Sequence, residues 1–197
     1  ASGKSWNALL QDIYFKPCGL ESSGFVNQFE WGEEPFGALE FTYPKGFDGA
    51  IENATPTDNP LIEAGMYTTM DDYGKLLMMH LKGGLCGETR IHPEETIERM
   101  HADRILEVYG GDTGFPGLEG YGMGWWVDRS KGGVVSDPGA YGSWLSIDEK
   151  LGLAVLTLME ANLSPEGWSL SLSLRPVLER YLNGVWTLQW SYGGSGS

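Results

Sequence analysis

One glycine-containing segment in the second half of the chain has the residue types to bind a developing negative charge. It reads Ser136-Asp-Pro-Gly-Ala-Tyr-Gly142 and follows an aromatic segment, Tyr121-Gly-Met-Gly-Trp-Trp-Val127. Gly139 and Gly142 flank Ala140 on a predicted strand, where glycine allows another group to approach the backbone closely. Backbone N–H groups exposed in this way stabilise an oxyanion in acyl-transfer sites. The alternative is that these glycines only mark a bulge or bend.

The sequence lacks the common nucleophile and cofactor motifs. No Ser-x-x-Lys, Gly-x-Ser-x-Gly or His-Glu-x-x-His occurs in it. No Gly-x-Gly-x-x-Gly segment opens a helix after a strand, which removes support for nucleotide binding. His80, His92 and His101 have no metal-ligand spacing, and His80 is interpreted as a core or boundary residue of an amphipathic helix. We therefore expect neither a metal nor another cofactor.

Composition narrows the possible partners. The 197 residues, of which 41% are hydrophobic, suffice for one globular domain with a core. The formal net charge of −14 opposes binding to nucleic acid and to anionic membranes. No apolar run is long enough to span a membrane, and we identify no signal peptide. Cys18 and Cys86 are interpreted as small buried residues, with a disulfide between them as the alternative.

Capping residues and the helical spacing of apolar residues predict four helices. They lie between Ser5 and Gly19, between Thr69 and Gly83, from Pro93 to about Met100, and from Ser164 to about Leu182. Pro176 is expected to kink or split the last of them, because proline removes a helical hydrogen bond.

Alternating and apolar patterns predict three consecutive antiparallel strands near the C-terminal end. They cover about 121–127, then 132–136 running on through 140–147, and 152–159. A weak strand pattern at 38–43 lies within the irregular stretch 21–60, and a glycine-rich loop is expected at 110–120. The predicted fold class is α+β, an antiparallel sheet with helices packed on it.

Several segments are recognisable in their order along the chain. They are 2–20, Ala64-Gly-Met-Tyr-Thr-Thr-Met-Asp-Asp-Tyr73 continuing to Gly84, Tyr121-Gly-Met-Gly-Trp-Trp126, and Asp137-Pro-Gly-Ala-Tyr-Gly142. Together they resemble the C-terminal part of the serine β-lactamase-like family, the group of class C β-lactamases, DD-peptidases and esterases. The first resembles the helix after the family's Tyr-x-Asn motif, the second its Ser-Thr…Asp helix, and the last two its closing strands.

The resemblance implies that 1–192 form the C-terminal part of one β-lactamase-like domain, with 193–197 as a linker tail. The family's Ser-x-x-Lys and Tyr-x-Asn motifs precede the matching segments. The expected partner is therefore an N-terminal segment of the same fold that supplies the nucleophile, and this chain alone is expected to be inactive. Tyr181-Leu-Asn183 has the letters of the second motif but is interpreted as a helix end.

The resemblance also implies roles at the glycine-containing segment. Asp137-Pro138-Gly139 stands where the family has Lys-Thr-Gly or His-x-Gly. The backbone N–H of Ala140, with Gly139 beside it, would then form the oxyanion hole, and Asp137, Pro138 and Tyr141 would contact substrate. An acidic residue stands where a cation normally binds a substrate carboxylate, so a neutral ester or amide is the expected substrate.

Three functions remain open from the sequence. The first is a serine hydrolase that works through an acyl-enzyme. The second is an inactive binding module that reuses the fold, and the third is an acidic, tryptophan-rich carbohydrate-binding domain. The resemblance favours a periplasmic or secreted location.

Overall fold

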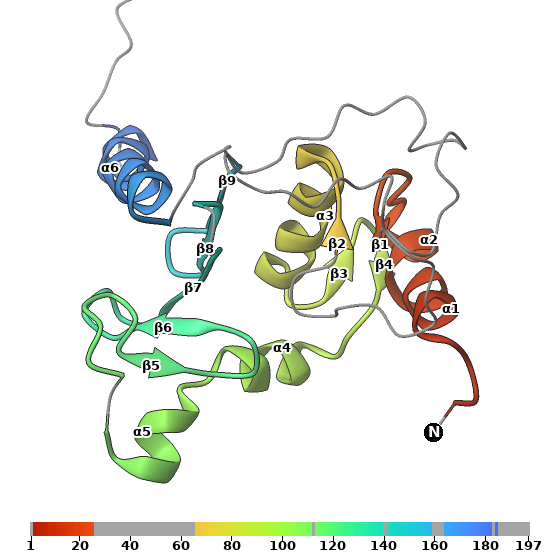
Figure 1. Cartoon of the computed structure of the whole chain (residues 1–197), viewed down its shortest axis with the longest axis horizontal. Helices are drawn as coiled ribbons and strands as arrows, with labels where there is room; N and C mark the ends of the chain where they lie inside the picture. The colour runs from red at the N-terminus through yellow and green to blue at the C-terminus, as the bar shows by residue number, and fades with distance from the viewer. Residues whose placement is uncertain are drawn as a thin grey trace, which may run out of the picture.

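A five-stranded antiparallel sheet forms the centre of the C-terminal half. The computed structural model describes residues 2–25, 66–111, 113–139, 142–158, 164–182 and 184. The strands are β5 (Gly120–Tyr121), β6 (Trp126–Asp128), β7 (Val134–Pro138), β8 (Trp144–Asp148) and β9 (Leu153–Thr157), in that order across the sheet. Helices α3 (Met70–Leu81) and α6 (Ser164–Leu182) lie on its opposite sides (Figure 1). The predicted α+β class with an antiparallel sheet is confirmed.

The strand boundaries differ from the prediction at two places. Residues 121–127 do not form one strand, because β5 and β6 pair with each other and Gly122 N–H donates to Trp125 O between them. The strand predicted to run from 132 through 147 is divided into two strands, β7 and β8, which pair antiparallel with each other. Apolar patterning could not locate these boundaries, since the residues on both sides of each boundary are suited to strands.

Alternation along the strands gives the sheet two different faces. One face is apolar and packs on α3, with a core of Leu77, Trp125, Val127, Val135, Leu145 and Ile147. The other face carries Ser136, Ser146 and Asp148, and faces α6. The Asp148 carboxylate accepts from Arg175 Nη2 of α6 at 2.5 Å, and both side chains are buried.

The N-terminal helical segment begins and ends as the sequence predicts. It consists of α1 (Trp6–Leu10), a π-helical turn (Gln11–Phe15) and α2 (Lys16–Cys18). The Ser5 hydroxyl accepts a hydrogen bond from Ala8 N–H at its start. Gly19 ends it in the left-handed conformation, with φ of 63°.

Thr69 caps α3, and acidic residues occupy the first turn of this helix, as predicted. There are also two small two-stranded antiparallel sheets: β1 (Gly24–Phe25) with β2 (Met66–Tyr67), and the hairpin of β3 (Leu85–Cys86) with β4 (Thr89–Arg90). The predicted helix after Pro93 is α4 (Glu94–His101). A further helix, α5 (Arg104–Tyr109), was not predicted; Asp103 caps it by accepting from Leu106 N–H.

Helix α6 spans its predicted range without a break at Pro176. The proline is exposed, so water can bind the carbonyl group that loses its helical partner. The predicted split is therefore wrong. The strand predicted at 38–43 and the tail at 193–197 lie outside the described residues.

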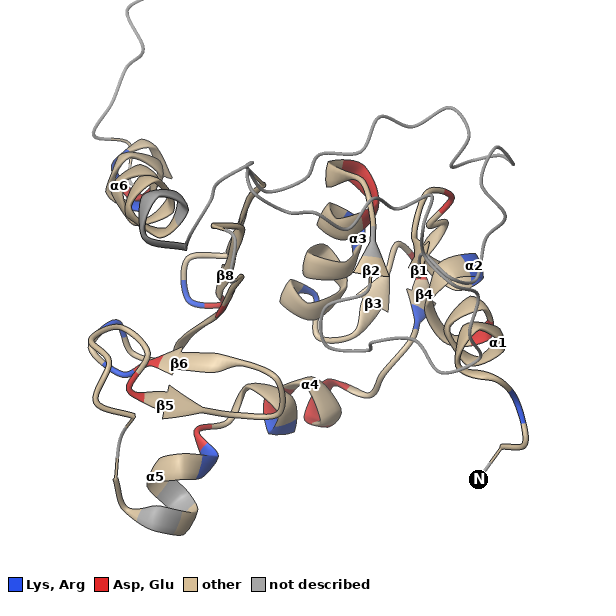
Figure 2. Ribbon diagram, viewed as in Figure 1, with Lys and Arg blue, Asp and Glu red and all other residues tan. Residues whose placement is uncertain are grey.

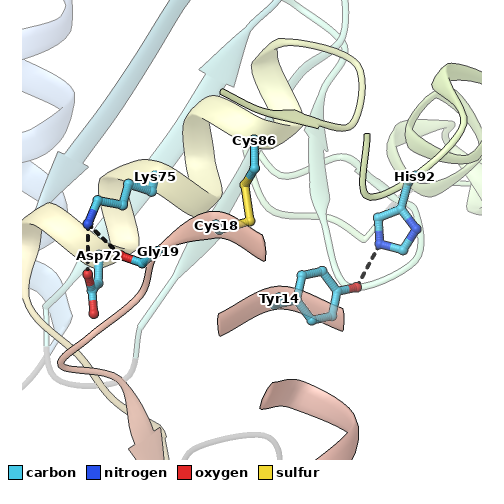
Figure 3. Close-up of a disulfide and its surroundings, with 7 residues drawn as sticks. All are labelled: Tyr14, Cys18, Gly19, Asp72, Lys75, Cys86 and His92. Atoms are coloured by element: carbon cyan, nitrogen blue, oxygen red, sulfur yellow. Dashed lines mark hydrogen bonds and ion pairs between the residues drawn. A yellow bond between two sulfur atoms is a disulfide. The ribbon is translucent and has the colours of Figure 1, made fainter. Parts of the chain in front are cut away.

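A disulfide joins Cys18 at the end of α2 to Cys86 in β3, with a Cα–Cα distance of 5.1 Å (Figure 3). The interpretation of both cysteines as unpaired buried residues is wrong. The chain brings them together because α2 packs beside the hairpin that follows α3, a relation that sequence spacing does not contain. The disulfide ties the N-terminal helical segment to the core around α3.

Charged side chains are scattered over the elements and do not gather on one of them (Figure 2). Among the described residues, no helix combines the length and apolar character needed to cross a membrane.

Candidate functional site

A cavity of about 310 Å³ lies between the N-terminal helical segment, α3 and the apolar face of the sheet. This volume is in the range of small-molecule sites. Its walls are mainly aromatic and aliphatic. The polar side chains among them come from different elements and are Tyr14, Tyr73, His80 and Asp137.

Asp137 lies near the end of β7, in register with Leu145 of β8. It shares the apolar face with Val135, because side chains two residues apart point to the same side. The side chain is partly exposed, but its carboxyl group lies on the cavity wall, and loss of hydration there raises its pKa. The structure thus places one predicted substrate-binding residue at the cavity.

Tyr73 stands on the first turns of α3 and lines the same cavity. Burial, together with the negative charge of Asp137, raises the pKa of Tyr73 to about 12. The phenol therefore stays protonated at neutral pH and remains a hydrogen-bond donor. The sequence analysis did not identify Tyr73, because its proximity to Asp137 depends on how α3 packs against β7.

In the predicted oxyanion segment, the structure describes Gly139 and Gly142. Gly139 N–H donates to Ser143 O at 2.8 Å, and Gly142 N–H donates to Gly139 O at 3.1 Å. Trp168 Nε1 of α6 also donates to Gly139 O, at 3.1 Å. A Cβ atom at Gly139 would overlap Ser143 Oγ, and Gly142 has a φ of 96°, so glycine suits both positions.

The hydrogen bond between Gly142 and Gly139 and the positive φ of Gly142 agree with the bend alternative for these glycines. Pro138 is the last residue of β7. Ala140 and Tyr141 lie outside the described residues. The oxyanion role of Ala140 and Gly139, and the substrate contacts of Pro138 and Tyr141, stay predictions.

A hydrogen-bonded chain of three side chains connects the cavity to the surface. His80 Nδ1 lies 3.2 Å from His101 Nε2, and His101 Nδ1 lies 2.8 Å from Glu149 Oε1. The two imidazole rings are stacked, and each meets Trp125 edge-on, at centroid distances of 4.9 and 5.1 Å. His101 is buried, whereas the side chain of Glu149 is 56% exposed.

Both histidines are held in their neutral form. Burial, and then the neighbouring His101 and His92, lower the pKa of His80 to about 4. Burial also lowers the pKa of His101, and Glu149 offsets only part of that effect. The interpretation of His80 as a core or boundary residue agrees with its position, but its partners His101 and Glu149 could not be read from the sequence.

A polar network fixes the N-terminal segment against α3 (Figure 3). The buried Asp72 carboxylate accepts from Ser22 N–H at 2.7 Å, Ser23 Oγ at 3.0 Å and Lys75 Nζ at 3.2 Å. Burial alone would raise the pKa of Asp72, but these hydrogen bonds outweigh it and hold that pKa below its usual value. Lys75 Nζ also donates to Gly19 O at 2.8 Å, which holds the end of α2 beside α3.

Tyr14 adds a second link between the N-terminal segment and the core. Its hydroxyl group lies 2.7 Å from His92 Nε2, just before α4 (Figure 3). Burial raises the pKa of Tyr14. Within the described part of the chain, no group of three His, Cys, Asp or Glu side chains is arranged to hold a metal ion.

Solved structures with the same architecture are about twice as long as this chain. A β-lactamase-like protein from Bacteroides dorei DSM 17855 is 23% identical with a TM-score of 0.57, and the match covers 93% of this chain and 53% of that one. The LovD9 mutant of simvastatin synthase from Aspergillus terreus is 16% identical with a TM-score of 0.64, and the match covers 93% of this chain and 51% of that one. A penicillin-binding protein homologue from Caulobacter crescentus is 13% identical with a TM-score of 0.53, and the match covers 81% of this chain and 48% of that one.

These likenesses establish the fold, and the chain spans about half the length of each neighbour. No curated protein matches the sequence significantly. The model of the beta-lactamase family matches residues 1–169, which is most of the chain. The protein therefore belongs to the beta-lactamase family.

Proposed function

We propose that this chain is the C-terminal portion of a serine hydrolase that acts on a neutral ester or amide through an acyl-enzyme. An upstream segment of the same fold supplies the nucleophilic serine, its lysine and the tyrosine of the second motif. The observation that carries the proposal is the family match over residues 1–169, combined with Asp137-Pro138-Gly139 at the cavity end of β7.

The preference for a neutral substrate rests on Asp137. A carboxylate at this position repels a bound carboxylate by roughly 1 kcal/mol at close range in water, and by more where water is excluded. The apolar walls of the cavity support the same preference, because they offer no cation for a charged substrate among the side chains that line it. In the proposed reaction, the backbone N–H of Ala140 stabilises the oxyanion next to Gly139.

Exposed apolar side chains support the proposed upstream partner. Helix α6 exposes Leu170, Leu172, Leu174, Val177, Tyr181 and Leu182. A row of exposed apolar residues along one helix is typical of a surface that another segment covers. The neighbours are about twice as long as this chain, so a protein of that size would have a further segment that could cover α6.

The Cys18–Cys86 disulfide supports a periplasmic or secreted location. Disulfides form and persist mainly in oxidising compartments.

Co-expression with a candidate upstream segment tests the proposed function. We expect a stoichiometric complex that hydrolyses a short-chain nitrophenyl ester and is inhibited by a fluorophosphonate, whereas the lone chain is inactive. Ala140→Pro removes the N–H group and should lower turnover on the order of 10²- to 10³-fold, with Ala140→Gly as the mild control. A folded Ala140→Pro variant with normal turnover excludes the oxyanion role, and a complex without turnover favours the inactive binding module.

Asp137→Lys tests the substrate preference. If Asp137 repels anions, the variant should raise the ratio of kcat/KM on nitrocefin to kcat/KM on the ester. An unchanged ratio means that Asp137 has only a structural role.

A further inference from the structure

The chain of His80, His101 and Glu149 has a defined direction at neutral pH. An ionised carboxylate only accepts hydrogen bonds, so Glu149 Oε1 accepts from His101 Nδ1–H. A neutral imidazole carries one N–H, so His101 Nε2 is then bare and accepts from His80 Nδ1–H. His80 Nε2 is consequently the bare nitrogen of a neutral ring.

His80 lines the cavity, and its Nε2 atom has no hydrogen-bond partner among the residues that the structure describes. Its lone pair is an acceptor beside walls formed by Leu10, Phe15, Leu77 and Met79. A polar group in such surroundings gains most from a ligand that can pair with it, because an unpaired polar group loses hydration without compensation.

We propose that Glu149, acting through His101, fixes His80 in the tautomer that presents a bare Nε2 to the cavity, and that the cavity binds small uncharged apolar molecules bearing one hydroxyl or N–H donor. The walls take the apolar part, and His80 Nε2 accepts from the donor. The surface carboxylate is a positioning residue, since it reaches the ligand only through two imidazole rings.

The size and chemistry of the cavity agree with this ligand class. Apolar cavities of about 150 Å³ hold a benzene ring, and this cavity has about 310 Å³. No Lys or Arg side chain of the described residues lines the cavity, so its walls offer no cation to an anionic ligand. The proposal concerns binding and holds whether or not the protein is a hydrolase.

Nitrogen NMR of the imidazole rings tests the first step. In the purified protein at pH 7, His80 and His101 should both carry their proton on Nδ1, with assignments made from His80→Gln and His101→Gln. Glu149→Ala should leave a mixture of tautomers at His80, whereas Glu88→Ala, a matched change at another exposed glutamate, should not. A proton on His80 Nε2 in the unchanged protein overturns the proposal.

Phenol and toluene, which differ by a hydroxyl in place of a methyl group, test the second step. Both should bind saturably. Glu149→Ala should weaken the affinity for phenol by roughly threefold to tenfold, the value of one hydrogen bond, and should leave the affinity for toluene unchanged. Glu88→Ala should alter neither. Absence of binding, equal weakening of both probes, or unaltered phenol affinity in Glu149→Ala overturns the proposal. A melting curve checks that each variant is folded.

Discussion

Acid should destabilise the fold through His80 as the pH falls from about 6.5 to about 4. The pKa of this histidine falls from an ordinary value of 6.5 to about 4 on folding, because burial and the adjacent His101 and His92 disfavour its charged form. Between pH 6.5 and pH 4, the unfolded chain binds a proton at His80 that the folded chain does not bind. The free energy of unfolding therefore decreases as the pH falls through this window.

The size of the effect follows from the shift. One pKa unit corresponds to 1.36 kcal/mol, so lowering the pKa of His80 from 6.5 to about 4 amounts to about 3 kcal/mol. His101 adds to the effect in the same direction, because its pKa is also lowered, whereas Glu149 works against it. Asp72 and Asp103, whose pKa values are lowered on folding, begin to lose their stabilising contribution at about pH 5 and lose most of it at lower pH.

Urea denaturation followed by tryptophan fluorescence, at pH values from 4 to 7.5, measures this dependence. His80→Gln should be less stable at neutral pH if packing is lost, but its stability should change by about 3 kcal/mol less across the window than that of the unchanged protein. His92→Gln serves as the histidine control and should retain most of the slope. If the free energy of unfolding of His80→Gln depends on pH as strongly as that of the unchanged protein, the buried pair of His80 and His101 is not the source of this dependence.

Three further predictions concern the contacts that hold the site together. Cys18→Ser with Cys86→Ser should reduce the free energy of unfolding by about 4 kcal/mol, since the disulfide closes a loop with a sequence separation of 68; equal stability of the oxidised protein and the variant would refute this role. Asp72→Ala should lower the free energy of unfolding by about 3 kcal/mol, because it leaves Ser22, Ser23 and Lys75 without their acceptor. The control Asp71→Ala, at the exposed neighbouring residue, should lower it by less than about 1 kcal/mol. Equal losses for the two variants in urea denaturation would show that the Asp72 network is unimportant. Gly139→Ala should lower the melting temperature because its Cβ overlaps Ser143 Oγ, and adding Ser143→Ala should restore part of the loss; no recovery would place the strain elsewhere.

The features that the sequence predicted correctly are local ones. Ser5 and Thr69 start helices because capping depends on hydrogen bonds within one turn, and neighbouring residues decide it. Pro93 precedes α4 without a side-chain capping bond, and its fixed φ suits a helix start. The family resemblance was also readable, since motif order is a property of the chain. The boundary between Val127 and Gly132 was predicted, but those within 121–127 and within 132–147 were not, because the residues on both sides of each suit strands.

The sequence by itself thus determined the fold class, most helix ends and the place of Asp137 in a recognisable motif. Only the tertiary structure decided which distant residues meet: Cys18 with Cys86, Tyr73 with Asp137, and His80 with His101 and Glu149. The physical reason is that these pairs join separate elements, so their distances depend on how α3 packs on the sheet and on the N-terminal segment. Their burial, which shifts the pKa values at the cavity, exists only once that packing has formed.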